Sequence, residues 1–199
     1  KNKYWLFHSA VVGSVLRRYG IKVGKRLYIE GVPRLKINGK AGNIAIGDDV
    51  SILGDIDIRN RENGKIVFED GVKIENDCRF VSAREGTISI GARSVVGAFS
   101  ILNGGSDIMI GRDCLISARV AINANEHKCV RDEKIKNQGF LHLPVIIEDD
   151  CLIGVNAVIN KGVTLKKGSV IGANSVVTQD TEEYSINAGV PARKIKERE

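Results

Sequence analysis

Aliphatic residues recur at every sixth position over most of the chain. The frame is uninterrupted from residue 147 onward, where its anchors are Ile147, Ile153, Ile159, Leu165, Ile171 and Val177. A small or medium side chain follows each anchor by four positions, as at Cys151 and Ala157. A period of six fits neither an amphipathic helix, whose period is about 3.6, nor an alternating strand, whose period is about 2. It predicts a solenoid whose coil has three flat sides of about six residues each.

The same frame extends upstream, with short insertions at the corners. Coils of three anchors start at Val23, Ile46, Phe68, Ile90, Ile110, Ile147 and Leu165. The short insertions contain turn residues and fall at 61–64, 84–86 and 103–106. Glycine follows many anchors, where it permits a close backbone approach or an unusual φ angle. These glycines are Gly47, Gly91, Gly97, Gly111, Gly154 and Gly172.

Residues 1–22 lie outside the frame. Tyr4, Phe7, Val11 and Val15 share one stripe at helical spacing, and basic residues lie at both ends of the segment. We expect a helix that caps the first coil, because a solenoid needs atypical ends. The alternative is a basic amphipathic helix that rests on an anionic membrane surface.

Composition and charge narrow the class of protein. The chain is 43% hydrophobic but only 5% aromatic, which suits a narrow interior of stacked aliphatic side chains. No apolar run approaches the roughly 18–20 residues of a membrane-spanning helix. The 30 Lys and Arg exceed the 24 Asp and Glu by a formal charge of only +6, and no basic run is interleaved with aromatics. We therefore expect no nucleic-acid partner.

The four cysteines form no CxxC pair and no close cluster with histidine, which excludes a disulfide scaffold and a zinc site. Cys78, Cys114 and Cys151 each lie four positions after an aliphatic residue. We expect them to be small buried side chains of the repeat, which implies a reducing compartment. The expected location is cytoplasmic, or peripheral to the inner face of the membrane.

The end of the chain resembles a known family. The segments VIGANSVVTQD (170–180) and NAGVPARKI (187–195) look like the closing sequences of the hexapeptide-repeat acyltransferases, above all the maltose/galactoside and polysaccharide O-acetyltransferases. The resemblance implies an all-β solenoid, a left-handed parallel β-helix of about seven coils. It divides the chain into an N-terminal helical cap (1–22), a β-helix (23–180) with an inserted loop (128–146), and a C-terminal tail at the CoA site (181–199).

The long insertion indicates where chemistry takes place. Residues 128–146 are rich in charge, and long loops in compact repeats are usually functional, although a solvated excursion is the alternative. His127 directly precedes this loop and matches the histidine in the motif of the resembled family. An imidazole accepts a proton near neutral pH, so we expect His127 to be the general base.

Four further residues are candidates for acceptor binding or for orienting the base: Asn103, Asn125, Glu126 and His142. Neighbours on an extended strand point to opposite faces, so Glu126 is not expected simply to orient His127. It is a candidate for acceptor binding or for a neighbouring subunit's site. Asn125 shares the side of His127, and Asn103 lies one coil below. His142, before Pro144 on the returning limb, matches no catalytic motif.

The donor site rests on the resemblance, which implies acetyl-CoA in a groove between two subunits. Carried over by position, its contacts are Gly154, Val155, Ala173, Thr178, Arg193 and Lys196. The backbone N–H near Val155 would stabilise the tetrahedral oxyanion, and Arg193 and Lys196 would meet CoA phosphates. An ordinary basic tail is the alternative for these two. The family often has Lys after the threonine of the closing hexad, whereas this chain has Gln179.

The expected function is an O-acetyltransferase that uses acetyl-CoA and a sugar or polysaccharide precursor, without a metal, as a homotrimer. Direct attack by the hydroxyl is expected, because no cysteine has an identified base that would make it a nucleophile. The close alternative is a sugar-nucleotide N-acetyltransferase. A non-catalytic structural or binding β-helix is the second class. A carbonic-anhydrase-like zinc site is disfavoured because His8, His127 and His142 are scattered.

Overall fold

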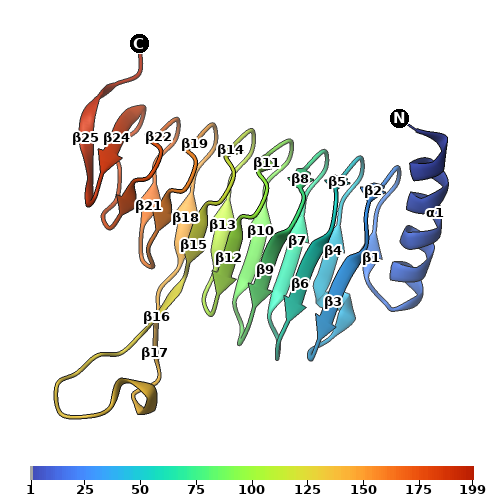
Figure 1. The fold of residues 1–199 in the computed structure, drawn as a ribbon, viewed down its shortest axis with the longest axis horizontal. Coiled ribbons are helices and arrows are strands. Elements are labelled where there is room, and N and C mark those ends of the chain that lie inside the picture. Colours follow the sequence, from blue (N-terminus) through green and yellow to red (C-terminus); the bar gives the residue numbers. More distant parts are fainter. Residues whose placement is uncertain (1) are drawn as a thin grey trace.

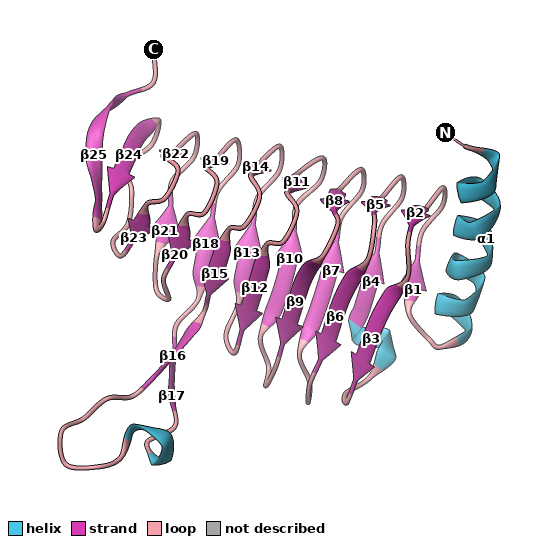
Figure 2. Cartoon of the chain, in the orientation of Figure 1, coloured by secondary structure: helices cyan, strands magenta, loops and turns pink. Residues whose placement is uncertain are grey.

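Three parallel sheets run along the chain, one for each side of the coil. The computed structural model describes residues 2–199. Figure 1 shows the coils stacked in sequence order along one axis, and Figure 2 shows strands and turns alternating around each coil. The predicted parallel β-solenoid of about seven coils is therefore confirmed.

We name the sheets A, B and C after the order in which a coil visits them. Sheet A contains β1 (Lys22–Val23), β4 (Ile44–Ile46), β7 (Lys65–Phe68), β10 (Thr87–Ile90), β13 (Ile108–Ile110), β18 (Val145–Ile147) and β21 (Thr164–Leu165). Sheet B contains β2 (Tyr28–Glu30), β5 (Ser51–Leu53), β8 (Lys73–Glu75), β11 (Val95–Val96), β14 (Leu115–Ile116), β19 (Leu152–Ile153), β22 (Val170–Ile171), β24 (Ser185–Gly189) and β25 (Ala192–Glu197). Sheet C contains β3 (Pro33–Ile37), β6 (Ile56–Asn60), β9 (Cys78–Ser82), β12 (Ile101–Gly104), β15 (Ala121–Asn123), β20 (Val158–Ile159) and β23 (Val176–Val177).

The remaining elements lie outside these sheets. They are the helix α1 (Lys3–Arg18), the hairpin strands β16 (Asn125–His127) and β17 (Phe140–His142), and the short 3-10 helices η1 (Ala41–Asn43) and η2 (Ile135–Asn137). Among residues 2–199, no helix is both long enough and apolar enough to cross a bilayer.

The hexad anchors form three continuous ladders inside the solenoid. In sheet B, for example, Ile52, Ile74 and Val96 occupy matching register positions on successive strands. All but two of the predicted anchors are buried, and the exceptions, Val23 and Leu35, are half-buried. Full burial of one such aliphatic side chain is worth about 1.5–3 kcal/mol, so the ladders are a major source of stability.

Small side chains fill the corners of the interior, as the repeat predicts. Cys78, Cys114 and Cys151 are buried and are free thiols. Burial raises the pKa of the Cys78 thiol to about 11, which makes it a poor nucleophile. Where the corner residue is polar, it bonds to the next coil: Ser94 Oγ accepts from the backbone N–H of Cys114 at 2.9 Å.

The glycines after the anchors make room for the neighbouring coil. A Cβ atom would lie 2.6 Å from the backbone nitrogen of Ala118 at Gly97, and 2.6 Å from that of Ala173 at Gly154. None of these post-anchor glycines has a φ angle in the left-handed region. That conformation occurs two positions later instead, as at Asn156. These glycines therefore allow a close backbone approach between coils, and they do not adopt an unusual φ angle.

Helix α1 lies across the N-terminal end of the solenoid (Figure 1). Asn2 caps it by accepting the backbone N–H of Tyr4 at 3.0 Å. Its buried face carries Ser9, Gly13 and Leu16, and Ser9 Oγ accepts the backbone N–H of Ile29 in the first coil at 2.8 Å. The apolar stripe identified in the sequence, Tyr4, Phe7, Val11 and Val15, is exposed. Ser9, Gly13 and Leu16, rather than this stripe, are the residues buried against the coil.

The C-terminal tail extends sheet B by a hairpin. Strand β24 pairs in parallel with β22, and β25 pairs antiparallel with β24 in a register that places Arg193 opposite Ala188. The hairpin covers the C-terminal end of the stack (Figure 1). The basic residues of the tail are thereby held on an ordered edge strand.

Candidate active site

A short antiparallel hairpin projects from the solenoid between sheet C and sheet A. Strand β16 leaves directly after β15, and β17 returns before β18, with the inserted loop between them (Figure 2). The base of the hairpin is fixed to the coil, because Ala124 N donates to the carbonyl of Asn103 at 3.0 Å and Leu143 N donates to that of Ala124 at 3.2 Å. The register pairs Asn125 with His142.

His127 is exposed on this hairpin and lies against an aromatic ring. The register pairs it with Phe140, and the centroids of the two rings are 4.0 Å apart at an interplanar angle of 37°. The contact limits the orientation of the imidazole, while the residue as a whole stays exposed. The structure thus presents His127 on an ordered strand at the point where the inserted loop departs.

A groove runs along the corner of the solenoid beside the hairpin. We call it the corner groove. Its cavity has a volume of about 370 Å³, and its walls are Arg61, Glu62, Val81, Ala83, Arg84, Asn103, Gly104, Gly105, Asn125, Phe140 and His142. Three of the acceptor-site candidates, Asn103, Asn125 and His142, therefore come together there. Asn125 Nδ2 donates to the carbonyl of Asn103 at 3.3 Å.

His142 faces the groove with a nitrogen that has no partner. Its Nδ1 atom is buried and makes no hydrogen bond within residues 2–199. Burial, with a smaller contribution from the positive charge of Arg84, lowers the pKa of His142. The lowered pKa favours the neutral imidazole, whose Nδ1 atom is a donor or an acceptor depending on the tautomer.

Glu126 is directed elsewhere. Its carboxylate forms an ion pair with Lys161 Nζ at 2.8 Å, and the lysine side chain is only 17% exposed. Glu126 is not among the residues that line the corner groove. Neighbouring side chains along β16 point to opposite faces, so Glu126 is directed away from the face of His127. The ion pair with Lys161 therefore links the hairpin to the next coil and does not orient the ring of His127.

The donor-site candidates lie on the later coils. Val155 and Ala173 are exposed on stacked turns, which are joined by a hydrogen bond of 2.8 Å from Asn174 N to the carbonyl of Val155. Gly154 packs closely against the backbone of Ala173 on the next turn. Thr178 is exposed one strand further on. None of these residues lines the corner groove.

The tail carries the basic candidates. Arg193 and Gln179 line one small cavity of about 90 Å³. Lys196 is exposed and its nearest acidic partner, Glu199, is 4.0 Å away. Lys194, in contrast, is held by Glu197 at 3.0 Å and by Glu182. Arg193 and Lys196 are thus the cations of the tail that can contact a ligand without breaking a short ion pair.

Only Asn103, Asn125 and His142 of the groove residues were predicted as site residues, and the unpredicted ones include Arg61, Arg84 and Phe140. Arg61 and Arg84 belong to turns that the sequence marks as corner insertions, but the hexad frame does not reveal that the two turns face one groove. Phe140 reaches the site only through the hairpin register. Among residues 2–199, no group of three or more His, Cys, Asp or Glu is placed to hold a metal ion.

Comparisons with known proteins agree with this architecture. Residues 144–179 match the family profile described as the hexapeptide repeat of succinyl-transferase. The chain is 30% identical over 161 residues to a probable acetyltransferase of Mycobacterium tuberculosis, an alignment that covers 79% of this chain and 51% of that protein. It is 32% identical over 179 residues to the bifunctional protein GlmU of Thermotoga maritima, covering 85% and 38%. The chain thus spans about half, or less, of the length of these relatives.

Among solved structures, the chain resembles a variant of AntD, an N-acyltransferase from Bacillus cereus, in complex with dTDP-4-amino-4,6-dideoxyglucose and coenzyme A. The TM-score is 0.65 at 23% identity, and the match covers 94% of this chain and 89% of the other. At this identity the likeness establishes a shared fold.

Proposed function

We propose that this chain, which belongs to the hexapeptide-repeat family, is a CoA-dependent acyltransferase that moves acetyl from acetyl-CoA to a hydroxyl of a sugar or polysaccharide precursor. The observation that carries the proposal is the position of His127, exposed on an ordered hairpin and in contact with Phe140, which lines the corner groove. An accessible imidazole beside a groove lined by two amides suits deprotonation of a bound hydroxyl.

The reaction needs no covalent enzyme intermediate. His127 takes the proton of the acceptor hydroxyl as its oxygen attacks the thioester carbonyl. The tetrahedral oxyanion then collapses, the carbon–sulfur bond breaks, and CoA leaves as a thiol with the proton returned by His127. A backbone N–H near Val155 stabilises the oxyanion, a contribution typically worth about 3–4 kcal/mol per donor. Asn103, Asn125 and His142 hold the acceptor.

The donor groove is proposed on the later coils. Gly154, Val155 and Ala173 line the path of the pantetheine arm, Thr178 adjoins it, and Arg193 and Lys196 meet the CoA phosphates. Gln179 stands where the resembled family often has a lysine, so the tail cations supply the charge. These residues do not line the corner groove, which supports a homotrimer in which one subunit's donor groove meets its neighbour's hairpin.

The second candidate reaction is transfer to an amino group of a nucleotide-linked sugar. It is favoured by the likeness to AntD, which is named an N-acyltransferase. The same base serves an amine, because it removes a proton from nitrogen as the amide bond forms. Acceptors that carry either an amine or only hydroxyls distinguish the two reactions.

The proposal is tested by measuring thiol release from acetyl-CoA with a panel of sugars, glycans and aminosugar nucleotides. His127→Ala removes the base, and we expect kcat to fall by about 10²–10⁴-fold. His8→Ala is the matched control, because His8 lies in α1 at the other end of the solenoid (Figure 1).

Unchanged activity in the His127→Ala variant would overturn the catalytic role. Absence of acetyl-CoA binding and turnover in the wild type would support a non-catalytic β-helix instead. Circular dichroism and the thermal midpoint establish that both variants are folded.

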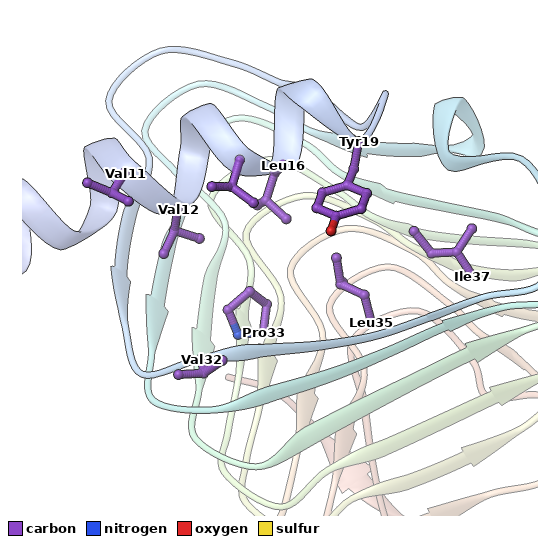
Figure 3. A pocket seen from close by; sticks show the side chains of 9 residues that line it. Val11, Val12, Leu16, Tyr19, Val32, Pro33, Leu35 and Ile37 are labelled. Carbon is purple, nitrogen blue, oxygen red and sulfur yellow. The ribbon is translucent and has the colours of Figure 1, made fainter.

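We also propose that the protein is cytoplasmic and that α1 rests on the inner membrane surface. The buried free thiols suit a reducing compartment. Figure 3 shows an apolar groove between α1 and β3, lined by Val11, Val12, Val15, Leu16, Tyr19, Val32, Pro33, Leu35 and Ile37, with a volume of about 570 Å³. The first acidic residue of the chain is Glu30, whereas Lys3, Arg18 and Lys22 are exposed. An apolar face with basic neighbours matches an anionic bilayer.

A further inference from the structure

We propose that the corner groove recognises an acidic acceptor: Arg61 and Arg84 bind a carboxylate or phosphate group carried by the sugar. The proposal rests on the function proposed above and names the chemical class of its acceptor. It starts from the two turns that the sequence marks as insertions, whose side chains the hexad ladders do not use.

The two arginines project from rigid, stacked turns. Arg61 follows β6 and Arg84 follows β9, and Arg61 N donates to the carbonyl of Ser82 at 2.9 Å. The buried side chain of Ser82 closes the second turn, because its Oγ donates to the carbonyl of Gly86 at 2.6 Å. In the first turn, Asn60 Nδ2 donates to the carbonyl of Gly64 and closes that turn in the same way. Both guanidinium groups therefore start from fixed backbone positions on one wall of the groove.

Neither guanidinium is neutralised within the part of the chain that the structure describes. Arg61 and Arg84 have no side-chain hydrogen bond and no ion pair there, whereas Arg93 is paired with Asp113. Glu62 is the one acidic residue among those that line the groove, against two arginines. The fork of an arginine fits two oxygens of a carboxylate or a phosphate, so two unpaired forks in one groove favour an anion.

The rest of the lining suits the sugar that carries this anion. Asn103 and Asn125 offer amides to hydroxyl groups, and the imidazole of His142 forms part of the wall, with its Nδ1 atom buried against Gly105. Phe140 provides a flat apolar surface, and its ring also touches the ring of His127 at 4.0 Å. An acceptor anchored at its charged end by Arg61 and Arg84 would thus extend past Phe140 toward the base.

The experiment compares matched acceptors: a neutral sugar, the corresponding uronic acid and the corresponding sugar phosphate. Dissociation constants come from ligand-observed NMR, and kcat/KM comes from thiol release. We expect at least a tenfold preference for one or both charged members, and the two charged arms identify which anion the groove takes. Arg61→Gln and Arg84→Gln should each remove most of that preference.

Arg112→Gln is the matched control, because Arg112 is an exposed arginine outside the groove whose side chain has no ion pair within residues 2–199. Equal binding of charged and neutral members by the wild type would overturn the proposal. A rise in KM for acetyl-CoA rather than for the acceptor would also overturn it, by assigning the arginines to donor phosphates. If thiol release is absent with every acceptor, the proposed function fails, but the NMR preference still decides whether the groove binds an acidic sugar.

Discussion

The contact between His127 and Phe140 links the proposed base to the corner groove. A ring on the facing strand at 4.0 Å restricts where the imidazole points. We therefore expect Phe140→Ala to lower kcat by about tenfold to a hundredfold, the size of effect that small misplacements of catalytic groups produce. KM for acetyl-CoA should change little, because Phe140 is not among the proposed donor contacts.

A positioning role for Phe140 has a specific signature in steady-state kinetics. Phe140→Tyr keeps the ring and should restore kcat, whereas Leu141→Ala alters the adjacent exposed residue of β17 and should have little effect. If Tyr fails to rescue kcat, or if Leu141→Ala lowers it equally, the ring contact does not position the base.

At this scale the sequence identified some of the candidate site residues and could not identify others. His127 stands out in the sequence because it is one of three histidines, directly precedes the long insertion and matches the histidine in the motif of the resembled family. His142 was among the sequence candidates, but Phe140 was not, because it reaches the groove only through an antiparallel register that the hexad frame does not fix. The ion pair of Glu126 with Lys161 likewise joins residues on different coils, so local spacing did not reveal it.

The elements differ in how much of their geometry the sequence determines. The anchors can be predicted from the sequence because each coil buries an aliphatic side chain at the same three positions. A single six-residue register therefore accounts for all three ladders. The buried face of α1 was not readable from hydrophobicity. Ser9 and Gly13 face the coil beside Leu16, because they are small and because Ser9 satisfies a backbone donor of the coil, while Tyr4, Phe7, Val11 and Val15 remain exposed.

Two glycine substitutions test how closely the coils pack on one another and how closely α1 packs on the first coil. Gly97→Ala should destabilise the protein by about 1–3 kcal/mol, because the added Cβ would lie 2.6 Å from backbone atoms of the next coil. Gly13→Ala should stabilise it by about 0.5–1 kcal/mol, because the position is inside a helix and the nearest atom to the new Cβ, on Arg17, is 3.5 Å away.

The measurement is urea unfolding followed by circular dichroism at one fixed protein concentration, with each variant compared with the wild type. A stabilising or neutral effect at Gly97 would mean that adjacent coils yield easily at their corners. A loss of stability at Gly13 would mean that α1 packs more tightly on the first coil than the distances indicate.

For the whole molecule, the proposed trimer and the proposed membrane contact depend on each other. A threefold axis places three copies of α1 at the same height along that axis, so a trimer presents three apolar surfaces together. Each surface alone is small, but linked sites bind with greater avidity than one. Gel filtration with light scattering should therefore report the mass of a trimer. The protein should also sediment with vesicles that contain anionic lipid, but not with neutral vesicles.

Substitutions on the exposed apolar face of α1, together with changes in salt concentration, test the proposed membrane contact. Phe7 is 73% exposed, so Phe7→Ser together with Val11→Ser should abolish sedimentation without unfolding the protein, whereas Ala10→Ser, on a neighbouring exposed position of α1, should have no effect. Raised salt should weaken binding, because the basic residues contribute through screened charge. A monomer by light scattering would overturn the shared active site. If the wild type does not bind vesicles and the Phe7→Ser/Val11→Ser variant loses self-association, the exposed apolar face of α1 instead contacts a second copy of the chain.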